Sequence, residues 1–340
     1  MKDDKIDIVI AWVDGNDSDW IKEKNKYSDN PEYVDGINES KFRDWGIFKY
    51  VFRGIEKNMP WVNHIYLVTC GQTPEWLDTS NEKISVVKHE EFIPQKYLPT
   101  FSSHPIELNF HRIQGLSEKF IYFNDDMFAI NSLKPEDFFY NEKPCDSAVL
   151  NVHCVQNSSA IYSICVNDVA VINDHCNLKS QLKQNFNKWF NWKYGIKNNI
   201  QNIIFSNCPR FPGFKQFHIP TPLLKSMYKE LWDKEYEILN ETSENKFRSK
   251  HDVNQWVIRD YQLATGNFNP SKRYKLGTLI DFDKNEITEE LEKCKKIILG
   301  NSYKLVCIND SDNIPNVEHV KNEVNNYLNN KFPQKSKFER

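Results

Sequence analysis

The sequence has no long hydrophobic run. Across its 340 residues, no uninterrupted apolar stretch approaches the roughly 20 residues that span a bilayer. The N-terminal segment MKDDKIDIVIAWVDG holds only a short apolar run, which is broken by Asp14 and lacks a small-residue cleavage site. This pattern fits a buried strand better than a signal peptide. We therefore expect a cytoplasmic protein.

An excess of charge of one sign is also missing. The 44 Lys and Arg residues are balanced by 47 Asp and Glu residues, which gives a formal net charge of -3. This balance argues against a protein built mainly to hold nucleic acid by its phosphates, so no nucleic-acid partner is expected. The eight cysteines include no CxxC pair. Their scatter favours free thiols over a disulfide framework.

What the sequence does contain is typical of a globular protein. Hydrophobic residues make up 39% and aromatic residues 14%, which is more aromatic than a disordered chain. The length suggests two domains of about 150 residues, or one large α/β domain with an insertion. Short apolar runs alternate with amphipathic ones, which predicts a parallel or mixed sheet with crossover helices. Strands are expected over residues 6–14, 64–70, 84–89 and 119–126.

Several segments have helical periodicity. Between the first two strands, apolar residues recur at helical spacing until a Met-Pro pair ends the run. These residues are Trp45, Phe48, Val51, Phe52 and Ile55. Further helices are predicted over residues 105–116, 177–195, 222–239, 250–265 and 317–328. The polar C-terminal FPQKSKFER is expected to be frayed.

Two of the predicted strands end in acidic clusters, AWVDGND at residues 11–17 and YFNDDMF at residues 122–128. Ligands of open α/β sheets lie beyond the carboxyl ends of the strands, so both clusters should face one crevice. Asn124, Asp125 and Asp126 offer the oxygen ligands that a hard cation such as Mg²⁺ takes. Asp and Asn after a strand also make turns and helix caps. Gly15 either lets the backbone approach a ligand or makes a turn.

Phosphate binding needs cationic groups as well. Arg43 is expected at the start of the first helix, where a helix N-terminus and a guanidinium can jointly hold an anion. It could equally pair with Asp44. Arg248 lies just before the helix predicted from residue 250 and has the same geometry available. His218, in KQFHIPTP, is a further candidate because imidazole titrates near neutral pH.

Taken in order, these segments resemble the Stealth family. IDIVIAWVDGND, FRDWGIFKYVFRGIEKNMPWVNHIYLVTCGQTPEWL and LPTFSSHPIELNFHRIQGLSEKFIYFNDDMF resemble its first two motif regions. FHIPTPLLKSM, with NKFRSKHDVNQWVIRDY, is similar to the third region, and LVCINDSD is similar to the fourth. The likeness spans most of residues 6–312.

The resemblance implies a sugar-1-phosphate transferase, similar to bacterial capsular and exopolysaccharide phosphotransferases and to the catalytic subunit of N-acetylglucosamine-1-phosphotransferase. Such enzymes move hexose-1-phosphate from a nucleotide-sugar, here a UDP-sugar, to a hydroxyl of an acceptor glycan and release UMP. The implied fold is α/β, with a Rossmann-like (GT-A-like) nucleotide-sugar transferase core, a mixed sheet and a helical insertion and C-terminal part. We accordingly expect the core in residues 1–150, an insertion in 151–215, a helical part completing the active site in 216–315, and a tail in 316–340.

Carried over residue by residue, the resemblance also assigns roles. Asn124, Asp125 and Asp126 would hold Mg²⁺ or Mn²⁺. The catalytic residues would be His218, Arg248, Asp126 and Arg43, with His218 or one of the two aspartates taking the acceptor proton. The residues expected to bind substrate are Trp12, Asp14, Gly15, Asp17, Asp44, Asn309 and Asp310. Some relatives have Asn at the position of Asp14, so binding rather than catalysis is assigned there.

Two other functions remain open on the sequence. A metal-dependent glycosyltransferase would use the same donor and metal but release UDP. A glycan-binding module would suit the aromatic content, yet every polar residue that a catalyst needs is present. The expected partners are a nucleotide-sugar donor and a glycan acceptor in the form of a lipid-linked oligosaccharide. Peripheral attachment at the inner membrane face through residues 179–197 is a further hypothesis.

Overall fold

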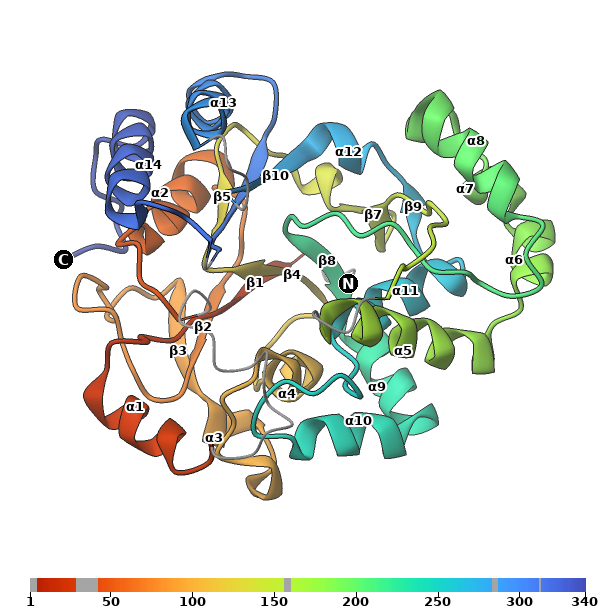
Figure 1. Cartoon of the computed structure of the whole chain (residues 1–340), viewed down its shortest axis with the longest axis horizontal. Coiled ribbons are helices and arrows are strands. Elements are labelled where there is room, and N and C mark those ends of the chain that lie inside the picture. Colours follow the sequence, from red (N-terminus) through yellow and green to blue (C-terminus); the bar gives the residue numbers. More distant parts are fainter. Residues whose placement is uncertain (1–4, 29–41, 156–159, 283–286, 312) are drawn as a thin grey trace.

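The computed structural model describes residues 5–28, 42–155, 160–282, 287–311 and 313–340 (Figure 1). Its centre is a five-stranded sheet with the order β3-β2-β1-β4-β8. Four strands run parallel, and β8 pairs antiparallel with β4. The predicted mixed α/β fold is therefore confirmed. The strands are β1 (Ile6–Ala11), β2 (Ile65–Thr69), β3 (Ile84–Lys88), β4 (Lys119–Asn124) and β8 (Thr221–Leu224).

Two smaller sheets extend this core. In one, β11 pairs parallel with β10 and antiparallel with β5, and in the other, β7 joins β6 to β9. Strands from the predicted parts 1–150 and 216–315 thus pair with each other, while the four-part division itself stays a prediction. The additional strands are β5 (Met127–Ala129), β6 (Phe139–Tyr140), β7 (Lys143–Asp146), β9 (Asn269–Pro270), β10 (Gly277–Asp281) and β11 (Leu305–Asn309).

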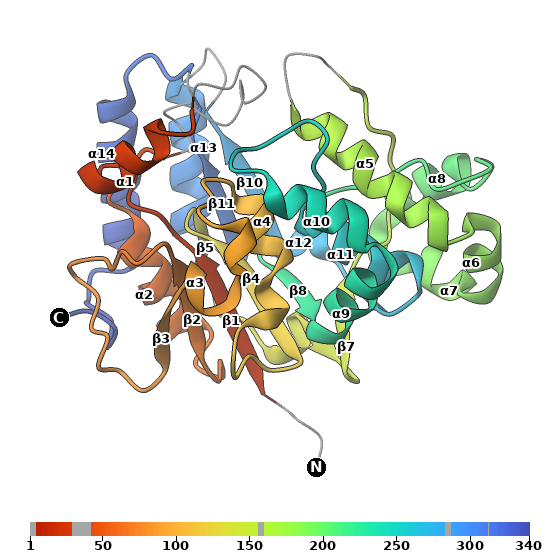
Figure 2. The same cartoon turned by 90° about the horizontal axis from the view of Figure 1, so that it is seen from below.

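Helices surround the sheets, with α13 and α14 at one end of the molecule and α6 to α8 at the other (Figures 1 and 2). None of the helices in the described ranges is long and apolar enough to cross a membrane. The helices are α1 (Ser18–Asn25), α2 (Phe48–Asn58), α3 (His89–Phe92), α4 (Ser103–Leu108), α5 (Ala160–His175), α6 (Leu178–Gln184), α7 (Phe186–Trp189), α8 (Gly195–Phe205), α9 (Lys225–Lys234), α10 (Tyr236–Glu244), α11 (Gln255–Ala264), α12 (Arg273–Leu276), α13 (Ile287–Leu299) and α14 (Val317–Lys331).

The sequence located the first strands and the first long helix well. The four predicted strands begin within one residue of β1 to β4. Their predicted ends lie one to three residues beyond the ends of these strands in the structure. All five apolar residues predicted to line the first helix segment are buried. Continuous apolar runs are the mark of parallel strands that are covered on both faces, and β2 is buried along its whole length.

Four predicted helices are wrong in part, and for the segment 250–265 the error is the start, because α11 begins at Gln255. The segment 222–239 opens with β8, because the four residues TPLL are buried and pair with β4 before α9 begins. The segment 105–116 is interrupted after α4, where the Asn109 side chain bonds back to the carbonyl of Pro105 and a 3-10 turn follows. The segment 177–195 splits into α6, α7 and the 3-10 turn Trp192–Tyr194.

The C-terminal tail is packed rather than frayed, which corrects the sequence-based expectation. Phe338 is buried, and the Nη2 atom of Arg53 lies 2.6 Å from Oε2 of Glu339. Arg53 also donates from Nη1 to the carbonyl of Phe332 at 2.8 Å. Both side chains of the ion pair are less than a tenth exposed. The tail is therefore held against α2 by a buried, two-point contact.

Removing the carboxylate of this ion pair is expected to destabilise the protein. In Glu339→Gln the Arg53 guanidinium stays buried without a charged partner, which should lower the free energy of unfolding by about 3 kcal/mol. Urea unfolding measures the change. Lys337→Gln is the matched control, because Lys337 lies on the same tail and is half exposed, 3.9 Å from Glu56. Equal unfolding midpoints for Glu339→Gln and Lys337→Gln would contradict the prediction.

Candidate active site

The candidate site lies where the order of the main sheet reverses. β2 and β3 follow on one side of β1, while β4 lies on its other side. Such switch points are where open α/β sheets bind ligands, beyond the carboxyl ends of the strands. A cavity of about 500 Å³ opens there. Ten predicted site residues line it: Trp12, Arg43, Asp44, Asn124, Asp125, Asp126, His218, Arg248, Asn309 and Asp310.

Three predicted substrate-binding residues lie outside the lining of this cavity, in the turn after β1. Asp17 caps α1 by accepting hydrogen bonds from the backbone N–H groups of Asp19 and Trp20, at 2.8 and 3.1 Å. Asp14 accepts from the Asn16 backbone N–H at 2.9 Å. Gly15 packs so tightly that a Cβ would lie 2.0 Å from a backbone oxygen of Phe42. These contacts fit the turn and cap interpretation, and ligand binding by the three residues stays a prediction.

The acidic residues of the turn between β4 and β5 repel one another. Asp125 has an exposed side chain that borders both cavities of the site, and its carboxylate is partly enclosed by protein atoms. This burial, with smaller contributions from the charges of Asp126 and Asp44, raises the pKa of Asp125 to about 7. Burial also raises the pKa of Asp126, against the opposing influence of His218 and Cys307.

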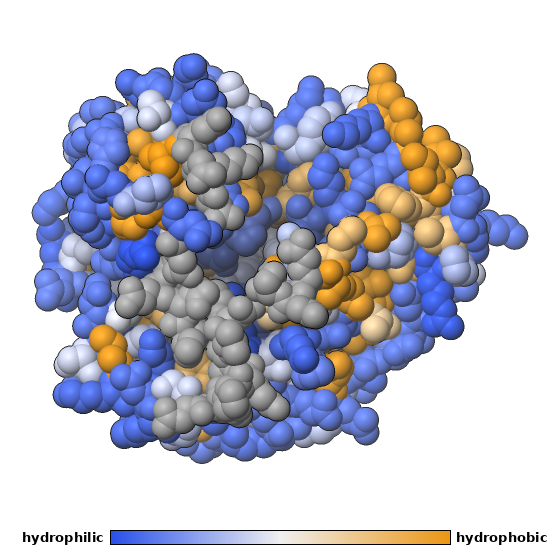
Figure 3. Space-filling model, in the orientation of Figure 1, coloured by the Kyte–Doolittle hydropathy of each residue, from blue (hydrophilic) through white to orange (hydrophobic). Residues whose placement is uncertain are grey.

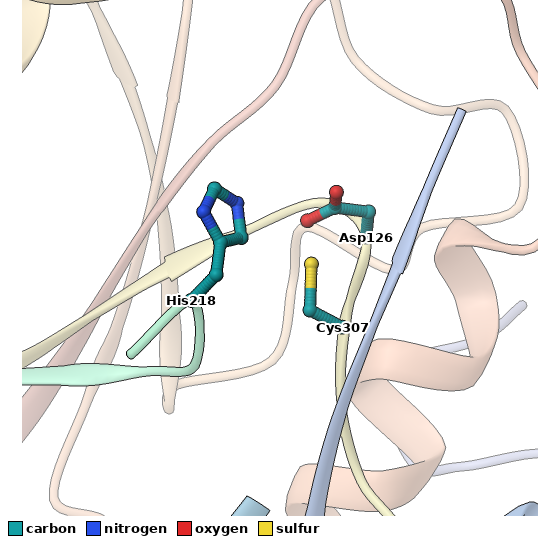
Figure 4. A group of neighbouring side chains, drawn as sticks. All are labelled: Asp126, His218 and Cys307. Atoms are coloured by element: carbon teal, nitrogen blue, oxygen red, sulfur yellow. The ribbon is translucent and has the colours of Figure 1, made fainter. Parts of the chain in front are cut away.

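Asp126, His218 and Cys307 converge from three different segments (Figure 4). The ligand atoms of these side chains all lie within 4.8 Å of one another. Antiparallel pairing of β11 with β5 brings Cys307 opposite Met127, and the Ile308 backbone N–H donates to the Asp126 carbonyl at 3.0 Å. From the sequence alone, Cys307 is expected only to be a free thiol. Its position two residues before Asn309, in LVCINDSD, was the available signal.

The donor atoms in the cavity suit a divalent cation. Oδ1 of Asn124 and Oδ1 of Asp126 are buried and have no hydrogen-bond partner among the described residues. Buried polar atoms normally have a partner, so these two oxygens are available to a ligand. Carboxylate and amide oxygens are preferred by Mg²⁺ and Mn²⁺, whereas the thiol of Cys307 suits softer metals. The predicted oxygen ligands therefore fit a cation on observations of this structure.

Arg43 is placed differently from the prediction. α2 begins at Phe48, so Arg43 lies in the preceding loop and not at a helix N-terminus. It pairs with Asp310, at 3.2 Å between Nη1 and Oδ1, instead of with Asp44. The other oxygen of Asp310 accepts from the Trp45 indole N–H at 2.9 Å. The loop turns at Gly46, which has a φ of +67°.

Arg248 also lies in a loop, because α11 begins at Gln255 and not near residue 250. Its Nη2 atom donates to the Ser103 hydroxyl at 3.1 Å. The loop is held by the buried carboxylate of Asp252, which accepts from the Ser249 backbone N–H and lies 2.9 Å from Nδ1 of His104. Sequence reasoning missed Asp252 and His104, since only the fold brings these residues together across 148 positions.

A second cavity of about 180 Å³ adjoins the first beyond the ends of β1 and β2. The two cavities share Trp12, Asp125 and Arg248. The smaller one is bordered by aromatic rings from α1, β4 and three loops, and Phe101 lies 5.9 Å from Trp20 between ring centres. Its aromatic residues are Trp12, Trp20, Phe42, Phe101 and Tyr122.

Comparison with known proteins explains why these segments converge. Residues 4–32 match Stealth protein CR1, conserved region 1, residues 41–146 match CR2, conserved region 2, and residues 296–340 match CR4, conserved region 4. The capsular polysaccharide phosphotransferase WcwK of Streptococcus pneumoniae is 39% identical over 99% of this chain and 98% of its own length. The chain belongs to the Stealth family.

Other relatives extend the likeness over the same length. The receptor polysaccharide phosphotransferase WefC of Streptococcus gordonii is 39% identical over 99% of this chain and 99% of its own. The exopolysaccharide phosphotransferase cps2G of Lactiplantibacillus plantarum is 37% identical over 98% and 96%. A crystal structure of the galactosyltransferase LgtC, with donor and acceptor sugar analogues, covers 94% of this chain and 95% of that chain at 10% identity and a TM-score of 0.41. That likeness is weak.

The Stealth regions account for most of the cavity. Asn124 to Asp126 and Arg43 fall in the second conserved region, and Asn309 and Asp310 in the fourth. The fourth region extends to residue 340 and so includes the packed tail. His218 and Arg248 lie outside the three matched ranges, so the resemblance of their segments to a third region stays a prediction. Membership makes this chain a phosphotransferase, as the sequence predicted.

Proposed function

We propose that this Stealth phosphotransferase transfers hexose-1-phosphate from a UDP-sugar to a hydroxyl of an acceptor glycan and releases UMP. The observation that carries the proposal is the cavity at the switch point, which brings carboxylates, two arginines and a histidine together beside an aromatic pocket. The named relatives act in the synthesis of capsular, receptor and exopolysaccharides. We assign this chain to the synthesis of such a surface polysaccharide.

The donor would lie across both cavities. The aromatic pocket offers flat apolar surfaces for the uracil and ribose, while Arg43 and Arg248 border the larger cavity, where the diphosphate would lie. Trp12, which stacks on Phe48 with ring centres 5.5 Å apart, borders both cavities. In this binding mode the sugar phosphate would point towards Asp126 and His218, which line the larger cavity.

Charge balance supports a metal cofactor. Asp310 is paired with Arg43, which leaves the carboxylates of Asp44, Asp125 and Asp126 in a cavity that must accept a doubly charged diphosphate. Mg²⁺ or Mn²⁺ held by Asn124, Asp125 and Asp126 would neutralise this charge and polarise the phosphoryl group. The two partnerless oxygens of Asn124 and Asp126 are the support for this assignment.

The reaction itself is a substitution at phosphorus. The acceptor oxygen attacks the β-phosphorus, the bond from that phosphorus to the bridging oxygen breaks, and the bridging oxygen leaves with UMP. His218 takes the proton of the acceptor hydroxyl, because it borders the cavity beside Asp126. Arg248 stabilises negative charge on the phosphoryl oxygens. Asp125 is the second candidate for the base, in an arrangement where Asn124 and Asp126 alone hold the cation.

We further propose an acceptor and a location for the reaction. A growing surface polysaccharide is an acceptor glycan, and we propose that it is presented as a lipid-linked oligosaccharide at the cytoplasmic face of the membrane. The names of the relatives indicate the class of polymer, a surface polysaccharide, but not the sugars in it. The assay below, with a panel of UDP-sugars, identifies the sugar of the donor.

The deciding experiment separates UMP from UDP. The purified protein is incubated with a panel of UDP-sugars and acceptor oligosaccharides, with Mg²⁺, Mn²⁺ or EDTA, and the released nucleotides are resolved by chromatography. UMP released only with both acceptor and metal is the expected result. UDP would make the chain a glycosyltransferase, and release that survives EDTA would contradict the metal cofactor.

A further inference from the structure

One long segment of this chain has basic residues but no acidic ones. Residues 177–229 contain eight lysines and one arginine and no Asp or Glu, although the whole chain has a net charge of -3. The first part of that segment forms α6, α7 and α8, at the end of the molecule opposite α13 and α14 (Figures 1 and 2). This end therefore has a local charge opposite to that of the protein.

The polarity of α8 is inverted relative to an ordinary surface helix, whose apolar face is turned to the core. Its inward side is polar: Asn198 and Asn202 are buried, and the Asn202 amide donates to the carbonyls of Ala148 and Trp189. Its outward side consists of four isoleucines at helical spacing, each more than half exposed. They are Ile196, Ile200, Ile203 and Ile204, with 82, 52, 57 and 60% exposure.

Aromatic and basic residues border this isoleucine face. Trp192, which precedes α8 by one turn, is 73% exposed, and the ammonium of Lys272 lies 4.4 Å from its ring centre. Lys197 is exposed on α8 itself, next to Ile196 in the sequence, and Lys183 is exposed on α6, at the same end of the molecule. An amphipathic helix with isoleucine and tryptophan on one side and lysines at its border is the composition of a segment that lies in a membrane interface.

We propose that the isoleucine face of α8, with Trp192 and the surrounding lysines, docks this protein on the surface of an anionic lipid bilayer. Charge decides between a membrane and a second copy of the chain. A symmetric dimer would bring the same lysines of both copies together, and like charges oppose that contact. Anionic headgroups attract the same lysines, at about 1 kcal/mol for each, or roughly fivefold in affinity.

The position of the face fits an acceptor that is carried by a lipid. Figure 3 shows hydrophobic surface over α8 and over α5 on the same side of the molecule as the hollow at its centre. α5 connects the two features, because Ile161 and Ile164 line the active-site cavity while Tyr162 and Val166 are exposed. The inference thus deepens the proposed lipid-linked acceptor and would present the cavity to a membrane-bound glycan.

The structure also selects the residues for the test. Lys188 and Lys193 donate to the backbone carbonyls of Gly266 and Pro270, so neutralising them would disturb the fold. Lys183 and Lys197 are exposed and suit substitution. The two variants are Ile200→Ser with Ile203→Ser, and Lys183→Gln with Lys197→Gln. Leu299→Ser is the matched control, because Leu299 is an exposed apolar residue, 41% accessible, at the opposite end of the molecule.

Flotation with vesicles measures the binding. The full chain is expected to float with vesicles of phosphatidylcholine containing 30% phosphatidylglycerol, and to be released by raised salt. The lysine pair should weaken binding roughly 30-fold and the isoleucine pair roughly tenfold, with Leu299→Ser unchanged. UMP release with a soluble acceptor should be equal in all four proteins, which separates a failure of docking from a failure of the proposed function.

Three results would overturn the docking proposal. These are no binding of the wild type to the anionic vesicles, equal binding of all variants, and equal binding to vesicles of phosphatidylcholine alone. Sedimentation of the free protein tests the other occupant. A wild-type dimer that Ile200→Ser with Ile203→Ser converts to a monomer would assign the face to a second copy.

Discussion

Asp126→Asn is expected to lower kcat for UMP release by about 10³-fold. The substitution keeps the size of the side chain but removes the charge of a carboxylate whose ligand oxygen lies within 4.8 Å of the ligand atoms of His218 and Cys307. Preorganised electrostatic groups contribute on this scale to barriers of transfer reactions. Initial rates at saturating UDP-sugar measure the change, and isothermal titration with Mn²⁺ should show weaker metal binding.

The matched control for this variant is Asp14→Asn. Asp14 lies in the turn after β1, at the same edge of the main sheet as Asp126. Its side chain accepts a hydrogen bond within its own turn. We expect less than about a tenfold change for it. Comparable losses of kcat in the two variants would contradict the prediction that the position of Asp126 in the cavity is what makes its charge important. Unchanged activity in Asp126→Asn would exclude Asp126 from the mechanism.

His218→Gln is expected to lower kcat by about 10³-fold while KM for the UDP-sugar changes little. Loss of a general base costs 10²- to 10⁴-fold, and glutamine keeps a polar side chain of similar length but takes no proton. The measurement is the separation of kcat from KM in the same UMP assay. His319→Gln is the control, because His319 is exposed on α14 and lies outside the cavity.

The alternative base predicts a different result. If Asp125 takes the proton, His218→Gln keeps most of its activity and Asp125→Asn loses it. Burial raises the pKa of Asp125 to about 7, so a rate that depends on its ionised form increases as the pH rises through about 7. The absence of that increase in Asp125→Asn would then identify the base as Asp125.

Local sequence patterns predicted the first half of the fold and the acidic half of the site. β1, β2 and β4 are continuous apolar runs, which buried parallel strands require. The acidic clusters follow those strands directly, so a rule about strand ends was enough to place Asn124 to Asp126 in a crevice. The side chains of Asp14 and Asp17 serve the turn and the helix cap, and substrate binding by these two residues stays a prediction.

The parts that could not be predicted depend on distant pairing. Arg43 meets Asp310 across 267 positions, and no pattern within either segment indicates the other. The start of the helix predicted from residue 222 is wrong, because TPLL forms β8. This strand is stabilised by pairing with β4, a contact between distant segments that outweighs local propensity. The tail was expected to fray because of its polar composition, yet buried Phe338 and the contacts with distant Arg53 hold it against the protein.

The pairing of β5 with β11 has a consequence for the synthesis of this protein. A ribosome delivers β1 to β4 early, so the central sheet has its four parallel strands when residue 124 has emerged. The cavity then still lacks Asn309 and Asp310, which arrive with β11 after most of the chain has been made. A chain that ends before β11 lacks two residues that line the cavity, Asn309 and Asp310. The strand order therefore makes a complete cavity depend on the synthesis of nearly the whole chain.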